Sequence, residues 1–102
     1  MVKNMSEQFI SRNTLYLIQA SYASTPLALS KLQQLYTQGD KVVLMGESVM
    51  HATHEVIQNI VECYVLENEQ PLLTAHPAHI QLIDYTTFVT LCLQFNRSIS
   101  LK

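Results

Sequence analysis

The chain has 102 residues with a formal net charge of −2, and 48% of its residues are hydrophobic. This length favours a single domain, and so high an apolar content excludes an intrinsically disordered chain. The slight acidic excess excludes a protein that holds a nucleic-acid backbone by its own net charge. No apolar run approaches the roughly 18 residues that a membrane-spanning helix needs, which predicts no membrane contact.

Residues 1–13 have weak hydrophobic periodicity, so we expect an N-terminal tail before a single domain over residues 14–102. The N-terminus shows no apolar core of a signal peptide, and Cys63 and Cys92 lie in apolar patterns rather than in a disulfide framework. These features predict a cytoplasmic protein in a reducing compartment.

Strand and helix patterns alternate through the first half of the chain. Residues 14–18 predict a short buried strand, and Thr25 followed by Pro26 predicts the cap and first position of a helix. Gly39 predicts the end of that helix, and residues 41–45 predict the second strand. The helix is expected to bury one stripe, which comprises Ala28, Leu29, Leu32, Leu35 and Tyr36.

The alternation continues with shorter elements in the second half. Residues 49–52 and 54–59 predict short helical pieces, and residues 60–66 predict the third strand. An acidic turn follows, then a short helix over residues 71–75 and a fourth strand over residues 79–83.

The last quarter of the chain carries the clearest pattern. An apolar run ends at Asp84, whose carboxylate is expected to cap a helix over residues 85–95, and residues 97–101 alternate as an edge strand does. The expected buried face of this helix comprises Tyr85, Phe88, Val89, Cys92 and Phe95. Strands that alternate with helices predict an α/β fold, a single-domain three-layer sandwich with a mainly parallel sheet of about five strands.

In open α/β sheets, functional loops lie beyond the carboxyl ends of the strands. Here these are residues 19–24, 46–50 and 66–71, together with Asp84 and Tyr85. The chain has only two glycines, which is too few for a dinucleotide fingerprint or a phosphate loop, so the sequence disfavours a nucleotide site.

The two cysteines are interpreted as packing residues. Cys63 lies in the third predicted strand beside Glu62, whose carboxylate would raise the pKa of a thiol, and Cys92 lies on the apolar face of the last helix. Neither position offers the exposure and thiolate-stabilising neighbour that a nucleophilic cysteine needs.

The four histidines form two pairs with a spacing of three residues. His51 and His54 make one pair, and His76 and His79 make the other. This spacing occurs in metal sites, but no cysteine or carboxylate completes a ligand set at a familiar distance. We therefore expect solvated or partner-facing histidines, with no metal and no cofactor.

Five residues near the predicted functional edge are candidates for a protein interface. Tyr22, Tyr85 and Phe88 are aromatic, and tyrosine suits interfaces because it buries a large area and keeps a polar group. Glu47 and Ser48 follow the second strand, where they favour capping or interface roles over catalysis because no partner residue is evident. The sequence therefore predicts no catalytic residue.

Three segments resemble the TusB/DsrH family, the small subunit of the DsrE/DsrF/DsrH-like sulfur-relay proteins. Residues 14–18 are similar to the opening strand of the family, and residues 39–52 are similar to its Gly-Asp strand and following helical turn. Residues 83–91, which read Ile-Asp-Tyr-Thr-Thr-Phe-Val-Thr-Leu, resemble the family's most specific motif. Glu47 and Ser48 stand where the family usually has Asp-Gly, and the chain lacks the family's C-terminal tryptophan.

The resemblance implies a heterohexamer that contains two copies of each of three related subunits and passes persulfide sulfur between carrier proteins. The implied partners are sister subunits of the TusC/DsrF and TusD/DsrE type and, through the complex, sulfur-carrier proteins. The resemblance implies that the transferred sulfur enters 2-thiouridine at the wobble position of tRNA or is used in dissimilatory sulfur oxidation. It implies that tRNA is only an indirect partner of this chain. The principal sulfur-carrying cysteine belongs to the TusD/DsrE-type subunit.

We therefore expect a non-catalytic subunit of a sulfurtransferase complex. Two alternatives remain open at the level of sequence. One is a sulfurtransferase that carries persulfide itself on Cys63 or Cys92, and the other is an independent α/β ligand-binding module.

Overall fold

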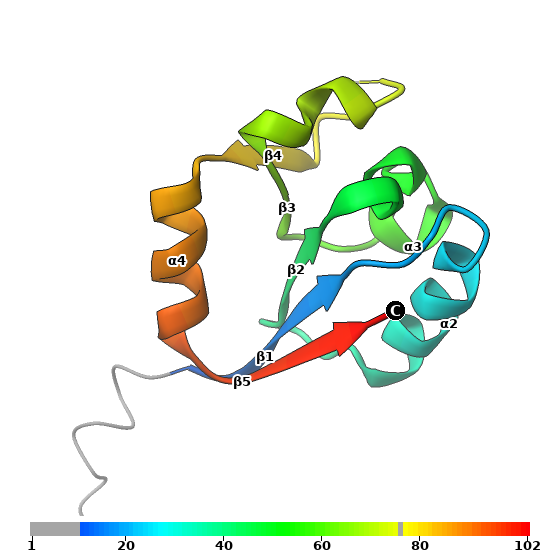
Figure 1. Ribbon diagram of the computed structural model, residues 1–102. Coiled ribbons are helices and arrows are strands. Elements are labelled where there is room, and N and C mark those ends of the chain that lie inside the picture. The colour runs from blue at the N-terminus through cyan, green and yellow to red at the C-terminus, as the bar shows by residue number, and fades with distance from the viewer. Residues whose placement is uncertain (1–10, 76) are drawn as a thin grey trace, which may run out of the picture.

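The computed structural model describes residues 11–75 and 77–102 as three layers, with a central sheet between helices (Figure 1). The sheet has the strand order β4-β3-β2-β1-β5, and each neighbouring pair is parallel. Its strands are β1 (Ser11–Ile18), β2 (Lys41–Leu44), β3 (Cys63–Leu66), β4 (Ile80–Ile83) and β5 (Phe95–Leu101). The expected single-domain α/β sandwich with a parallel five-stranded sheet is confirmed.

The helical segments divide between the two faces of the sheet. They are α2 (Thr25–Leu35), η1 (Gly46–His51), α3 (Glu55–Gln58), η2 (Glu67–Leu72) and α4 (Tyr85–Gln94). The chain steps from β1 to β4 in one direction, and right-handed crossovers then place α2, η1, α3 and η2 on one face. The connection from β4 back to β5 reverses that direction, so α4 lies on the opposite face (Figure 1).

The two faces bury unequal amounts of apolar surface. The α2 face carries the larger core, which includes Ile18, Leu29, Val42 and Ile57. The core on the α4 face is smaller and comprises Leu15, Val43, Tyr64, Ile83, Leu91 and Phe95. The α4 face is therefore the less completely covered side of the sheet.

Several elements differ from the sequence-based expectation at their ends. β1 begins at Ser11, before the expected residue 14, and residues 1–10 of the expected tail lie outside the described residues. β3 begins at Cys63 rather than at residue 60, because Val61 lies in an exposed bend that is 79% accessible. The expected acidic turn forms the first part of η2, so Pro71 lies inside this helix rather than opening one.

The start of α2 also differs from the expectation. Ser24 occupies the cap position, and Thr25 is fully buried. The Thr25 hydroxyl donates to the Ser21 carbonyl at 2.7 Å and lies 3.0 Å from the Ser48 hydroxyl, so it ties α2 to η1. Leu35 is 49% exposed, and it does not belong to the buried stripe of the helix.

The cap of α4 is confirmed, and its buried face is expected only in part, because Phe88, Cys92 and Phe95 pack on the core but Tyr85 and Val89 do not. Asp84 Oδ1 accepts from the Thr87 backbone N–H at 2.7 Å. Tyr85 is 71% exposed and Val89 is 38% exposed, whereas Leu91 is buried. The ten residues of α4 include no Asp, Glu, Lys or Arg, so the sequence offered more than one apolar stripe and packing on the sheet selected one of them.

A buried carboxylate joins the start of β1 to the turn between α2 and β2. Asp40 is 3% exposed, and its Oδ1 accepts from the Thr14 backbone N–H at 2.8 Å and from Asn13 Nδ2 at 3.0 Å. Its Oδ2 accepts from the Thr37 backbone N–H at 2.8 Å. Burial alone would raise the pKa of the Asp40 carboxyl, but these hydrogen bonds hold that pKa below its usual value.

Gly39 completes this turn through its backbone conformation. Its φ is 96°, and a Cβ at this position would lie 2.8 Å from Asn13 Oδ1. Only glycine fits this close approach without displacing the Asn13 side chain, so Gly39 and Asp40 together fix how α2 leads into β2.

The substitution Asp40→Ala is expected to lower the free energy of unfolding by roughly 1–3 kcal/mol, because it leaves the buried Thr14 N–H without an acceptor. Urea unfolding measures this change. Glu62→Gln is the control, because Glu62 and Lys41 form a partly exposed ion pair at 3.6 Å whose loss should cost about 1 kcal/mol or less. Equal effects of the two substitutions would contradict the role given to Asp40.

The Asp40 network is also expected to make stability depend on pH. The pKa of Asp40 is lower in the folded protein than in the unfolded chain, so its stabilising effect is complete above the unfolded pKa and is lost as the pH falls through the folded pKa. The stability difference between the wild type and Asp40→Asn should therefore shrink between about pH 5 and about pH 2, around and below the ordinary pKa of an Asp carboxyl. A difference that stays constant over this range would refute the assignment.

Candidate functional site

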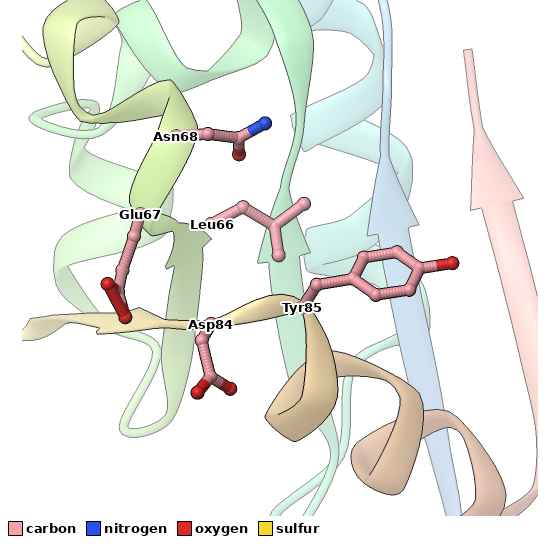
Figure 2. Close-up of a pocket in the computed structure, with 5 residues that line it drawn as sticks. All are labelled: Leu66, Glu67, Asn68, Asp84 and Tyr85. Carbon is pink, nitrogen blue, oxygen red and sulfur yellow. The ribbon is translucent and has the colours of Figure 1, made fainter.

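The strand order identifies one crevice at the carboxyl edge of the sheet. β3 and β4 are neighbours, but β3 continues into η2 on one face and β4 continues into α4 on the other. Where adjacent connections diverge in this way, an α/β sheet opens a crevice that commonly holds the functional site. A pocket of about 270 Å³ lies at this point, lined by Leu66, Glu67, Asn68, Asp84 and Tyr85 (Figure 2).

The side chains that line the pocket divide into two groups. In Figure 2, the carboxyl groups of Glu67 and Asp84 point to one side, whereas Leu66, Asn68 and Tyr85 point to another. Leu66 also packs against the core of the α4 face. The pocket therefore has an aliphatic and aromatic side with one amide, and two carboxylates flank it.

The Asp84 carboxylate is engaged in helix capping. Hydrogen bonds from Thr87 hold the pKa of Asp84 below its usual value, so the group is an anion near neutral pH. A general acid needs a proton to give, and a general base works best with a pKa near the operating pH. Asp84 therefore serves the fold rather than proton transfer.

A second group of residues surrounds Tyr22, beyond the carboxyl ends of β1 and β2. The Tyr22 backbone N–H donates to Glu47 Oε1 at 2.6 Å, and His51 Nε2 donates to the Tyr22 carbonyl at 2.8 Å. The rings of Tyr22 and His51 stack with their centroids 4.4 Å apart. Side chains of η1 thus hold Tyr22 from both sides and present a ring that is 53% exposed.

Ser48 is not available to a partner, contrary to its expected role as an interface residue. It is fully buried, and its Oγ accepts from the Ala20 backbone N–H at 2.9 Å. The same Oγ lies 3.2 Å from the Ala20 carbonyl and 3.0 Å from the Thr25 hydroxyl. The hydroxyl therefore fixes the loop after β1 inside the protein.

The remaining expected interface residues fall into two separate places. Tyr85 and Phe88 lie together on α4, with ring centroids 6.2 Å apart, and Phe88 is partly buried against the core. Tyr22 and Glu47 lie together at the end of β1 and do not line the pocket. The structure thus does not bring all the expected residues into one site.

The sequence placed residues 66–71 at the functional edge, but it singled out no site residue at the end of β3 or in η2. Leu66 and Asn68 line the pocket, and Glu69 Oε2 accepts from the Gly46 backbone N–H at 2.7 Å. The acidic segment after the third predicted strand was the available signal. Only the strand order, with β3 next to β4, places that segment beside Asp84.

The two thiols are poorly suited to form thiolates. Cys63 is fully buried, and burial raises its pKa to about 12. Cys92 is partly buried on α4, and burial raises its pKa as well. A nucleophilic cysteine needs a lowered pKa and access to its substrate. The pKa of both thiols is raised, and Cys63 also lacks access.

Two of the described histidines make structural hydrogen bonds, whereas His79 Nε2 is buried without a hydrogen-bond partner among the described residues. His51 binds the Tyr22 carbonyl, and His54 Nδ1 accepts from the Val56 backbone N–H at 3.2 Å, which caps α3. His76, the first residue of the second histidine pair, lies outside the described residues. Over residues 11–75 and 77–102, no three His, Cys, Asp or Glu side chains gather in a way that could hold a metal ion.

Within the same part of the chain, every helix is too short or too polar to cross a membrane.

A family model described as DsrH like protein matches residues 23–98 of the 102. The matched segment contains the Gly-Asp strand and the Ile-Asp-Tyr motif that carry the resemblance, as well as every residue that lines the crevice pocket. The search of curated proteins found no match.

Ser48→Ala is expected to destabilise the protein by roughly 1–3 kcal/mol, because the buried Ala20 N–H loses its acceptor. Thermal or urea unfolding measures the loss. Ser21→Ala is the matched control, because the Ser21 hydroxyl accepts only an exposed hydrogen bond from the Ser24 N–H. If Ser48→Ala proves as mild as the control, the Ser48 hydroxyl does not fix the loop.

Proposed function

Because the chain belongs to the DsrH family, and with it to sulfur relay, we propose that it is a non-catalytic subunit of a sulfurtransferase complex. The observation that carries this proposal is the family match over residues 23–98 in a chain whose described thiols are buried or partly buried. Its sister subunits are of the TusC/DsrF and TusD/DsrE type, and one of them supplies the sulfur-carrying cysteine.

The chemistry of persulfide transfer supports this division of labour. A thiolate attacks the terminal sulfur of a donor persulfide, a new S–S bond forms, and the donor leaves as a thiolate. The attacking sulfur must therefore be ionised and must reach a bulky protein donor. Burial keeps the thiol of Cys63 protonated and out of reach, and it also raises the pKa of Cys92, which supports a reactive cysteine on a sister subunit.

We assign the delivered sulfur to 2-thiouridine at the wobble position of tRNA, in the cytoplasm. The net charge of −2 supports an indirect relation to tRNA, because a direct contact with the phosphate backbone requires a basic surface. Sulfur-carrier proteins then link this complex, a heterohexamer with two copies of each subunit, to the enzyme that modifies the tRNA.

Co-expression with the two sister chains from the same genome tests membership of the complex. The expected result is one species in size-exclusion chromatography that contains all three chains. A monomer that elutes alone under the same conditions would contradict the proposal.

Mass spectrometry of the complex after incubation with a persulfide donor tests the absence of a catalytic cysteine. The expected sulfur adduct lies on a sister subunit, and the Cys63→Ala and Cys92→Ala variants retain transfer within about twofold, since neither thiol carries sulfur. An adduct on Cys63 or Cys92 that disappears with the matching substitution would make this chain a sulfurtransferase in its own right.

Deletion of the gene tests the destination of the sulfur. The expected result is a loss of 2-thiouridine from bulk tRNA that the wild-type gene restores. Unchanged tRNA thiolation, accompanied by impaired sulfur oxidation, would assign the complex to dissimilatory metabolism instead.

A further inference from the structure

The α4 helix leaves part of its sheet face uncovered. It starts at the carboxyl end of β4 and ends at the amino end of β5, where Phe95 pairs with Ser11 of β1. It thus crosses the sheet diagonally and moves away from the carboxyl ends of β1 and β2 (Figure 1). Among the described residues, α4 is the one helix on this face.

The burial of side chains along two strands shows where the cover ends. Leu15 in β1 and Val43 in β2 are fully buried. Leu17 and Met45 lie two residues further along, on the same face, and are only partly buried. The accessible apolar surface therefore begins at the carboxyl half of the sheet.

Apolar residues that are exposed or only partly buried gather between the sheet and the first turn of α4. We call this apolar patch the α4 notch, and it comprises Leu17, Met45, Leu66, Tyr85 and Phe88. Leu66 and Tyr85 also line the pocket at the carboxyl edge, so the pocket and the notch share these two residues. Tyr85 stands at their junction with 71% of its surface exposed.

The notch has the composition of the centre of a protein interface. Its five residues are aliphatic or aromatic, and α4 carries no Asp, Glu, Lys or Arg, although Leu93 on its outer side is 79% exposed. Solvent-facing helices normally carry charged residues, whereas interface centres are depleted of charge and enriched in tyrosine, phenylalanine and methionine.

The size of the pocket favours a protein side chain over a small molecule. Its volume of about 270 Å³ is below the roughly 300–1,000 Å³ that is usual for small-ligand sites. Glu67 and Asp84 are among the residues that line the pocket, and no described Lys, Arg or His lines it, so the charge at this edge favours a basic group at the margin of the occupant.

These carboxylates argue against a second copy of this chain. A two-fold contact places the same surface patch on both partners, so the carboxylates beside Tyr85 in one copy would approach those of the other. Like charges brought together at an interface disfavour that pairing. A different chain that carries Lys or Arg around its contact surface does not meet this repulsion between like charges.

We propose that the α4 notch is the docking site for a sister subunit that inserts an aliphatic or aromatic side chain beside Tyr85 and places Lys or Arg opposite Glu67 and Asp84. This inference rests on the proposed function and adds the surface and the partner chemistry to it. Tyr85 is the anchor, because an exposed aromatic ring at the centre of an apolar patch typically carries a large share of the binding energy.

Binding of purified sister subunits to Tyr85→Glu tests the proposal, with Val61→Glu as the matched control. Val61 is an exposed apolar residue, 79% accessible, that lies at the opposite edge of the sheet before β3. Tyr85→Glu should weaken binding at least tenfold, Tyr85→Phe by less, and Val61→Glu by less than twofold. Equal melting temperatures of the variants show that each one folds.

A second arm tests the charge of the occupant. Glu67→Lys should weaken sister binding, and binding of the wild type should weaken as the salt concentration rises, because exposed charge pairs are screened. Insensitivity to both would overturn the assignment of a basic rim.

The outcomes separate this inference from the proposed function. If wild-type protein binds no sister subunit, the proposed function fails first and the docking site fails with it. If the wild type and Tyr85→Glu bind the sisters equally well, the complex stands and the α4 notch is not its docking site. If Tyr85→Glu instead abolishes self-association of the isolated chain, the notch joins two copies of this protein and the proposal is wrong.

Discussion

One crossover has to cover a whole face of a five-stranded sheet, and much of this structure follows from that constraint. The chain steps from β1 to β4 in one direction, so its first three connections all pack on the α2 face. The return from β4 to β5 supplies α4 alone on the other face of the described domain. A ten-residue helix is about 15 Å long, so it spans this face only along a diagonal and leaves the α4 notch open.

The polar side chains at the ends of the strands mainly fix connections. Asp40 binds the backbone of β1 at the amino edge of the sheet, and Ser48 and Glu47 bind the backbone of the loop after β1. Asp84 caps α4. Each of these groups accepts a hydrogen bond from a backbone N–H, which lowers the cost of burying or ordering that backbone. These four side chains therefore serve to fix the connections between strands and helices.

The proposed role as a non-catalytic subunit requires a contribution through shape and charge. The chain combines a rigid parallel sheet with two exposed tyrosines, Tyr22 and Tyr85, at the edge where α/β proteins commonly bind their ligands. The proposed complex uses this edge as a protein contact, and the reactive cysteine of a sister subunit is then positioned by the assembly. The buried thiol of Cys63 agrees with this view, because its pKa of about 12 keeps it protonated.

The sequence by itself determined the α/β class, the alternation of strands and helices and the Asp84 cap, because these depend on local periodicity and on hydrogen bonds between near neighbours. It also indicated the family through the Ile-Asp-Tyr motif. Only the tertiary structure decided which stripe of the uncharged α4 faces the core, that Ser48 is buried, and that η2 and Asp84 share a crevice. These features depend on strand order and on packing between residues far apart in the chain, which local patterns do not encode.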